Sequence, residues 1–336
     1  MSELIRISAA LLPVFIFLVV LIFIDSYKLV KFRAVLVTIL MGCMAAVVCS
    51  ILNGWLRSVL HLDMDSYSKF VAPISEELLK ALFIIYLIRS GKIGFMVDGA
   101  IYGFALGAGF SFIENIYYLY SLMNSDLFVW IIRGFGTAIM HGGTMAIFAI
   151  FSKSLYERDP YEKFIKLLPG LAIAIVLHGI YNQFFFGPVF NTIVFLTALP
   201  LLILFVYDRS EEALREWLEM GLDSDAFLLN MIISGNISDT KLGRYLHSLK
   251  EKFPGEIVAD MLCLLRINLE LSLRVKGILL MREKGYTTPV DPELKDKLQE
   301  LKYLEKNIGK TGRLALAPVT HTTSRDLWQL YIVKNK

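Results

Sequence analysis

Residues 72–83 read APISEELLKALF, and they run into IIYLI, residues 84–88, with no loss of hydrophobicity. The segment looks built for lipid, yet it carries two adjacent carboxylates, Glu76 and Glu77, and the amine of Lys80. An ionisable side chain within a membrane span costs at least about 2.5–3.5 kcal/mol on insertion scales, and it survives where it faces protein or a water-filled cavity. These charges therefore indicate a functional site inside a membrane protein.

The composition of the whole chain agrees with this interpretation. Of the 336 residues, 56% are hydrophobic and only 19% are charged, whereas soluble domains have about 25% charged residues. The mean hydropathy is +0.58. A formal net charge of +3 is too small to indicate a nucleic-acid partner. The composition instead predicts a polytopic protein whose partner is the lipid bilayer.

Apolar runs of about 20 residues, the length that crosses a bilayer core, recur through the first part of the chain. We predict about seven spans, at 8–24, 34–52, 70–88, 94–120, 127–151, 167–186 and 189–206. Beyond these runs, charged and apolar residues mix at helical spacing. The sequence therefore predicts an all-α fold: a membrane helix bundle at 1–206, followed by a mainly helical cytoplasmic domain at 207–336.

Lysine and arginine in the short loops predict the orientation in the cell membrane. The loop after the fifth predicted span carries Lys153, Arg158, Lys163 and Lys166, whereas the connection at 121–126 carries neither residue type. The loops after the first and third spans are also basic. Because basic loops stay in the cytoplasm, we expect the N-terminus outside the cell and the C-terminus inside.

Polar residues also interrupt the spans that follow Lys80. They are Asp98, Glu114, Asn115, Arg133, His141, His178, Asn182 and Gln183. We interpret Arg133 as an interfacial side chain that reaches toward water. Glu76 and Lys80 share a helix face at i, i+4, and His178 shares one with Asn182. We expect the glutamates, the histidines and Asn182 to meet in the outer half of the membrane, with Asp98 apart from them.

Carboxylates beside imidazoles suit two kinds of hydrolytic chemistry. A carboxylate can act as the general base that activates water, or the group can hold a metal that does so. The same side chains would suit a proton relay in a transporter, but no inverted repeat is evident. An inactive membrane scaffold is a third hypothesis, although a scaffold would not need the whole set of polar residues.

Four motifs, in order along the chain, resemble the PrsW family of bacterial intramembrane proteases. They are EELLK at 76–80, DGAIYGFALGAGFSFIEN at 98–115, the segment around His141, and HGIYN at 178–182. The resemblance covers about 65–190, and it extends to the wider group that includes the CAAX prenyl endopeptidase and the bacteriocin-immunity-type membrane proteases. It implies an endopeptidase that cuts a single-span membrane protein, such as an anti-sigma factor, on the outer side.

The resemblance also implies roles for individual residues. Glu76 or Glu77 would be the base that activates water. His141 and His178 would bind the water, a metal or the oxyanion. Asn182 would donate a hydrogen bond to the oxyanion that develops on the substrate.

Whether the reaction needs a metal stays open on the sequence alone. A zinc ion would be held by His141, His178 and Glu77, while a glutamate-dependent enzyme would need no cofactor. Glu114, near the outer end of its predicted span, is expected to belong to the same catalytic group. The motif H-E-x-x-H of soluble zinc peptidases does not occur in the chain.

Overall fold

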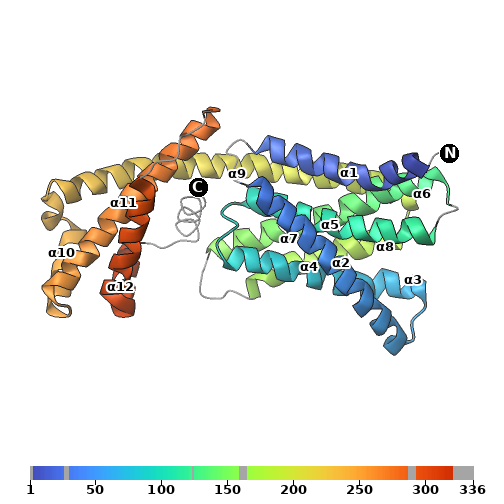
Figure 1. Ribbon diagram of the computed structural model, residues 1–336, viewed down its shortest axis with the longest axis horizontal. Coiled ribbons are helices and arrows are strands. Elements are labelled where there is room, and N and C mark those ends of the chain that lie inside the picture. The colour runs from blue at the N-terminus through green and yellow to red at the C-terminus, as the bar shows by residue number, and fades with distance from the viewer. Residues whose placement is uncertain (1–2, 26–29, 123–124, 159–164, 287–292, 321–336) are drawn as a thin grey trace. The chain divides into compact units, whose positions relative to one another are not determined.

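The computed structural model describes residues 3–25, 30–122, 125–158, 165–286 and 293–320, and every regular element in these ranges is a helix (Figure 1). The chain divides into two compact units, Met1–Glu211 and Glu212–Lys336, and the division falls within helix α9. The elements up to α9 are α1 (Glu3–Ile24), α2 (Phe32–Leu60), α3 (Met64–Ser66), η1 (Tyr67–Val71), α4 (Ala72–Arg89), α5 (Met96–Ser121), α6 (Leu127–Ile131), η2 (Ile132–Thr137), α7 (Ala138–Arg158), η3 (Ile165–Leu167), α8 (Leu168–Gln183) and α9 (Pro188–Ile233).

Six helical segments of the described chain are long and apolar enough to cross a membrane. They are Glu3–Phe23, Phe32–Leu60, Met96–Ser121, Leu127–Tyr156, Ile165–Gln183 and Pro188–Ile233. The seventh predicted span, 70–88, is also helical, but its helix α4 has only 18 residues and carries Glu76, Glu77, Lys80 and Arg89. The all-α polytopic fold class is confirmed, and six of the seven predicted spans meet the criteria of length and composition, whereas α4 does not because of its charged residues.

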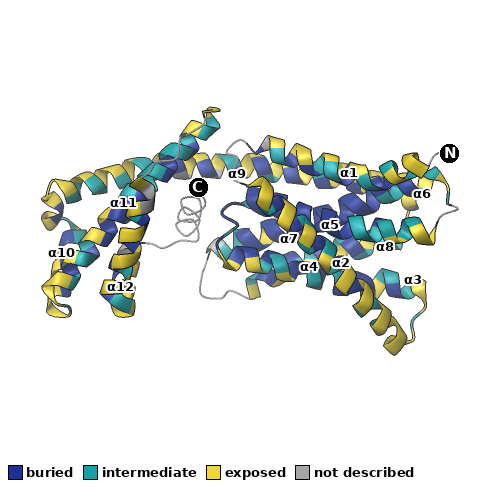
Figure 2. Cartoon of the chain, in the orientation of Figure 1, coloured by how far each residue is buried: buried dark blue, intermediate teal, exposed yellow. Residues whose placement is uncertain are grey.

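Helices α5 and α7 form the centre of the first unit. In Figure 2 both are mostly dark blue, whereas α1 and α2 show yellow outward faces. Glycines on two sides of α5 allow its backbone to approach its neighbours. A Cβ atom at Gly107 would lie 2.1 Å from the carbonyl oxygen of His141 in α7, and one at Gly109 would lie 2.0 Å from that of Ile39 in α2. Small residues permit such close packing between membrane helices.

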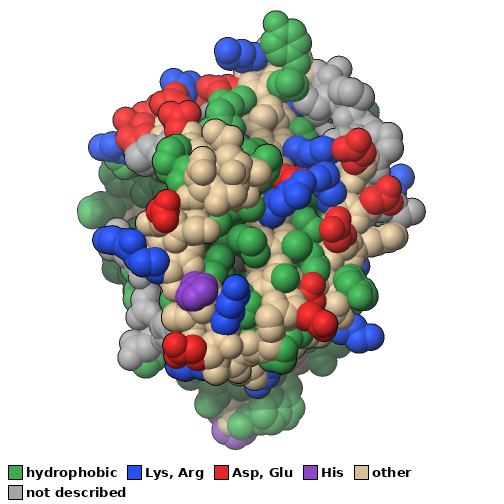
Figure 3. All heavy atoms as spheres, turned by 90° about the vertical axis from the view of Figure 1, so that its left-hand side faces the viewer, with side chains coloured by type: hydrophobic (Ala, Val, Ile, Leu, Met, Phe, Trp, Pro, Cys, Tyr) green, Lys and Arg blue, Asp and Glu red, His purple; other side chains and the backbone are tan. Residues whose placement is uncertain are grey.

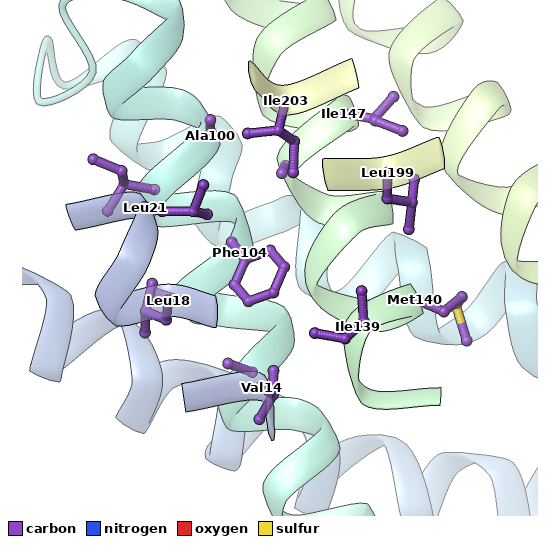
Figure 4. Close-up of a cluster of buried hydrophobic side chains, with 14 of the residues drawn as sticks. Val14, Leu18, Leu21, Ala100, Phe104, Ile139, Met140, Ile147, Leu199 and Ile203 are labelled. Atoms are coloured by element: carbon purple, nitrogen blue, oxygen red, sulfur yellow. The ribbon is translucent and has the colours of Figure 1, made fainter. Parts of the chain in front are cut away.

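An apolar cluster holds α1, α5, α7 and α9 together (Figure 4). The ring of Phe104 lies at its middle, and the side chains of Leu18, Ile139 and Ile203 surround it from three other helices. All four side chains are buried. The packing of this cluster fixes α5 and α7, which carry polar residues described below.

A wider π-helical turn precedes each of two helices, α4 with Glu76 and α7 with His141. The segment η1 (Tyr67–Val71) leads into α4, and η2 (Ile132–Thr137) leads into α7. Pro73 explains the first of these turns, because a proline lacks an N–H and its ring clashes with the carbonyl group four residues earlier. π-Helical turns of this kind occur frequently at functional sites.

The second unit contains the end of α9 and a set of shorter elements. They are η4 (Asn236–Asp239), α10 (Lys241–Ser248), η5 (Leu249–Glu251), α11 (Gly255–Glu283) and α12 (Glu293–Thr320), and α12 bends at Gly309. Inside this unit the buried Lys276 pairs with Asp225 at 2.6 Å. Figure 3 views the chain from the side of α10 and α12, where acidic and basic side chains lie among apolar ones. Charged side chains of both signs therefore lie on the surface of this unit.

Candidate active site

Glu77 lies at the centre of a buried polar cluster. Its Oε1 atom accepts a hydrogen bond from Lys80 Nζ at 2.5 Å and lies 2.7 Å from His178 Nδ1. The side chains of Glu77 and Lys80 are both 0% exposed. The pair forms because residues three apart lie on one face of α4. Glu76 shares a helix face with Lys80, but among the described residues the lysine pairs with the neighbouring carboxylate of Glu77.

The contact with Glu77 determines which nitrogen of His178 carries the proton. An ionised carboxylate only accepts hydrogen bonds, so we assign the N–H of His178 to Nδ1. Its Nε2 atom then holds a lone pair, and this atom lies 3.9 Å from Oε2 of Glu76. A basic nitrogen and a carboxylate oxygen thus lie close together.

His141 approaches the same place from α7. Its Nδ1 atom lies 3.1 Å from Lys80 Nζ, and its Nε2 atom lies 2.8 Å from Oε2 of Glu114. An ammonium group only donates, so we assign the N–H of His141 to Nε2, from which it points to Glu114. The rings of His141 and His178 are perpendicular, with centroids 4.8 Å apart.

Arg133 completes the surroundings of Glu114, and the sequence interpretation missed this role. The guanidinium forms an ion pair with Glu114 at 3.1 Å, donates to Oδ1 of Asn115 at 2.9 Å and covers the ring of Tyr118. It was expected to reach toward interfacial water. An arginine in an apolar helix with a carboxylate in the preceding helix is the signal that favours the ion pair.

Glu76 differs from Glu77 in its exposure and its partners. Its side chain is 13% exposed, and its Oε1 atom accepts a hydrogen bond from Asn53 Nδ2 at 3.3 Å. Sequence reasoning did not find Asn53, because the predicted second span ended at residue 52. Helix α2 continues to Leu60, which carries the Asn53 amide to Glu76.

Asn182 lies one turn beyond His178 on α8, as the spacing predicted, but it reaches a different partner. Its amide Nδ2 donates to the carbonyl oxygen of Ser68 at 2.9 Å. The structure therefore gathers five of the six predicted residues into one hydrogen-bonded and ion-paired cluster. The sixth residue, Asn182, lies at the edge of this cluster, against η1.

The donor atoms of Glu76, His141 and His178 all lie within 4.8 Å of one another. Two imidazoles and a carboxylate form the ligand set of several zinc peptidases, so these residues fit a catalytic metal. The expected set contained Glu77 in place of Glu76. Glu77 contacts the far nitrogen of His178, which is the position of a group that orients a metal-binding histidine.

Comparison with known proteins identifies the family of the chain. A family profile described as PrsW family intramembrane metalloprotease matches residues 30–207. Searches of the curated proteins and of the solved structures gave no match. The profile covers more than half of the chain and includes every residue of the cluster. The chain therefore belongs to the PrsW family of intramembrane metalloproteases.

Proposed function

We propose that the protein is an endopeptidase that hydrolyses a membrane-anchored protein at the outer side of the membrane, with Glu76 as the base. The observation that carries this proposal is the position of Glu76 Oε2, 3.9 Å from the unprotonated nitrogen of His178. A water molecule held between a carboxylate and an imidazole is ready to lose a proton as its oxygen attacks a peptide carbonyl.

The two adjacent glutamates have different roles in the proposed reaction. Glu77 is fully buried and its charge is balanced by Lys80, so it holds His178 in place and does not reach the substrate. Glu76 is partly exposed, so it can accept the proton of the attacking water and pass it to the leaving amine. Glu114 supports His141 in the same way that Glu77 supports His178.

Asn182 supplies the hydrogen-bond donor of the proposed reaction. One amide N–H binds the Ser68 carbonyl, and an asparagine amide has two N–H groups. The second would donate to the oxyanion that forms as water adds to the scissile carbonyl. Removing one such donor costs about 10²–10³ in kcat in a well-studied protease.

A zinc ion at this site would be held by Glu76, His141 and His178 and would supply a more acidic water. Both nitrogens of His141 have partners, Lys80 and Glu114. Metal binding through His141 therefore requires one of these contacts to break. In a metal-free reaction both contacts of His141 would stay in place, and Glu76 would be the base that activates water.

Cleavage of a tagged single-span membrane protein by purified protein in lipid tests the proposal. We expect Glu76→Gln to lose cleavage while it unfolds at the wild-type temperature. A chelator that stops the wild type, with recovery on addition of zinc, would assign the metal-dependent reaction. Activity of metal-free protein would assign the reaction to the glutamate alone. Normal cleavage by Glu76→Gln would contradict the proposed base.

A further inference from the structure

We propose that Asn53, held in place by Tyr67, is a positioning residue that fixes the orientation of the Glu76 carboxylate. The inference rests on the proposed role of Glu76 as the base. It assigns a function to two side chains, one in α2 and one in η1. Both lie outside the Glu–His cluster, which consists of Glu76, Glu77, Glu114, His141 and His178.

The contacts form a short chain of hydrogen bonds that ends at Glu76. The phenol of Tyr67 donates to Oδ1 of Asn53 at 2.7 Å, and the hydroxyl of Ser75 lies 2.7 Å from the same oxygen. On the other side of the amide, Nδ2 of Asn53 donates to Oε1 of Glu76 at 3.3 Å. Tyr67 and Ser75 are both buried.

The amide of Asn53 has only one favourable orientation within this series of hydrogen bonds. If it were turned over, its oxygen would face the Glu76 carboxylate, which has no proton to donate when ionised. The hydroxyls of Tyr67 and Ser75 can donate or accept, so the ionised carboxylate of Glu76 is the group that sets the orientation. Tyr67 therefore acts on Glu76 through Asn53, and it has no direct hydrogen bond to the carboxylate among the described residues.

Fixing one oxygen of Glu76 determines where the other points. With Oε1 bound to Asn53, Oε2 is directed to Nε2 of His178. A carboxylate that is free to rotate would place this oxygen elsewhere for part of the time, and a base displaced by about 1 Å can cost about 10²-fold in rate. The contact therefore contributes to turnover more than to substrate binding.

The wide turn at η1 brings Tyr67 to this position. Asn182 anchors the same turn, because its amide donates to the carbonyl oxygen of Ser68 at 2.9 Å. Charged and titratable groups from four helices also face Glu76, so the Asn53 bond acts among competing interactions. These groups are Glu77, Lys80, Glu114, His141 and His178.

A double-variant cycle on the full-length protein in lipid tests the proposal, with kcat and KM measured for a tagged single-span substrate. We expect Asn53→Leu to lower kcat by about 10²-fold and Tyr67→Phe by about 10-fold, with KM within about two-fold of the wild type. The double variant should be no slower than Asn53→Leu alone, because Tyr67 acts through Asn53. Additive losses in the double variant would overturn the proposal.

Asn53→Asp separates positioning from helix packing. The aspartate keeps an acceptor for Tyr67 and Ser75 but loses the N–H that binds Glu76, so we expect it to be as slow as Asn53→Leu. Near-normal kcat for Asn53→Asp would show that the asparagine only joins the helices, and would overturn the proposal. The kcat of Asn53→Asp still tests the proposal if Asn53→Leu fails to fold.

Matched controls come from α2, which carries Asn53, and from α4, which carries Glu76. Ser50→Ala in α2 and Tyr86→Phe in α4 remove exposed hydroxyl groups that bond to Val47 and Lys92, and both should keep wild-type kcat. Glu76→Gln is measured in parallel. If it is inactive while Asn53→Leu and Tyr67→Phe turn over normally, the positioning role is wrong and the base stands. If Glu76→Gln is active, both proposals are wrong.

Discussion

Glu76 and Glu77 are neighbours in the sequence, but their surroundings assign them different tasks. Adjacent residues on a helix point about 100° apart, so one can face a cavity while the other faces packed helices. Glu77 meets a lysine and a histidine in the interior. Glu76 meets an amide and the open nitrogen of His178.

This difference predicts that Glu77→Gln destabilises the fold more than Glu76→Gln does. The glutamine leaves the fully buried ammonium of Lys80 without its counter-charge, and breaking a buried ion pair from one side costs about 3–5 kcal/mol. Thermal unfolding in detergent should show a lower midpoint for Glu77→Gln. Equal midpoints for the two variants would contradict the ion pair as a source of stability.

A second prediction concerns the amide of Asn182. If its free N–H stabilises the oxyanion, Asn182→Ala should lower kcat by about 10²–10³ with a smaller effect on KM. Kinetics on a cleaved single-span substrate would measure both values. A wild-type kcat for Asn182→Ala would contradict the oxyanion role and leave the hydrogen bond to Ser68 as the only function of the side chain.

The sequence predicted the identities of the clustered residues better than it predicted their contacts. Helical spacing shows which side chains share a face of one helix, such as His178 and Asn182, but it cannot show which faces of different helices meet. Lys80 illustrates the limit. Both Glu76 and Glu77 are within its reach along α4, and the choice depends on His141 in another helix.

The close contact of α5 and α7 determines the position of His141. A methyl group at Gly107 would collide with the backbone carbonyl of His141, 2.1 Å away, and backbone atoms cannot move aside cheaply. We therefore expect Gly107→Ala to lower both the unfolding temperature and the cleavage rate.

Gly54→Ala in α2 is the matched control for this prediction. A Cβ atom there meets nothing within 4 Å, and alanine favours a helix over glycine by roughly 0.5–1 kcal/mol. The control should be as stable as the wild type or slightly more stable. Loss of stability in Gly54→Ala, or none in Gly107→Ala, would contradict the packing argument.

Element boundaries explain why the sequence alone did not indicate the contacts of Asn53 and Arg133. Hydropathy ends the second span at residue 52, because polar residues follow, but the helix itself continues to Leu60 and includes Asn53. Arg133 lies in η2, whose wide turn no periodicity predicts. In both cases a tertiary contact, and no local pattern, gives the residue its place.

The orientation of the protein in the membrane is a prediction from the charged loops. We expect a reporter fused after Lys336 to be active only in the cytoplasm, because basic residues gather in the loops on that side. A second fusion at Ser121, the end of α5, should be active only outside. The reverse pattern would place the Glu–His cluster in the inner half of the membrane.

The π-helical turn η1 makes the spacing along its helix as important as the residue types. One residue corresponds to about 100° of rotation around an α-helix, so the wide turn acts as a phase shift between Tyr67 and Glu76. Deleting one residue from 68–70 would restore a regular helix and turn Tyr67 away from Asn53, although every functional side chain would still be present. This stretch should therefore tolerate substitution of Phe70, which is exposed, far better than any change in its length.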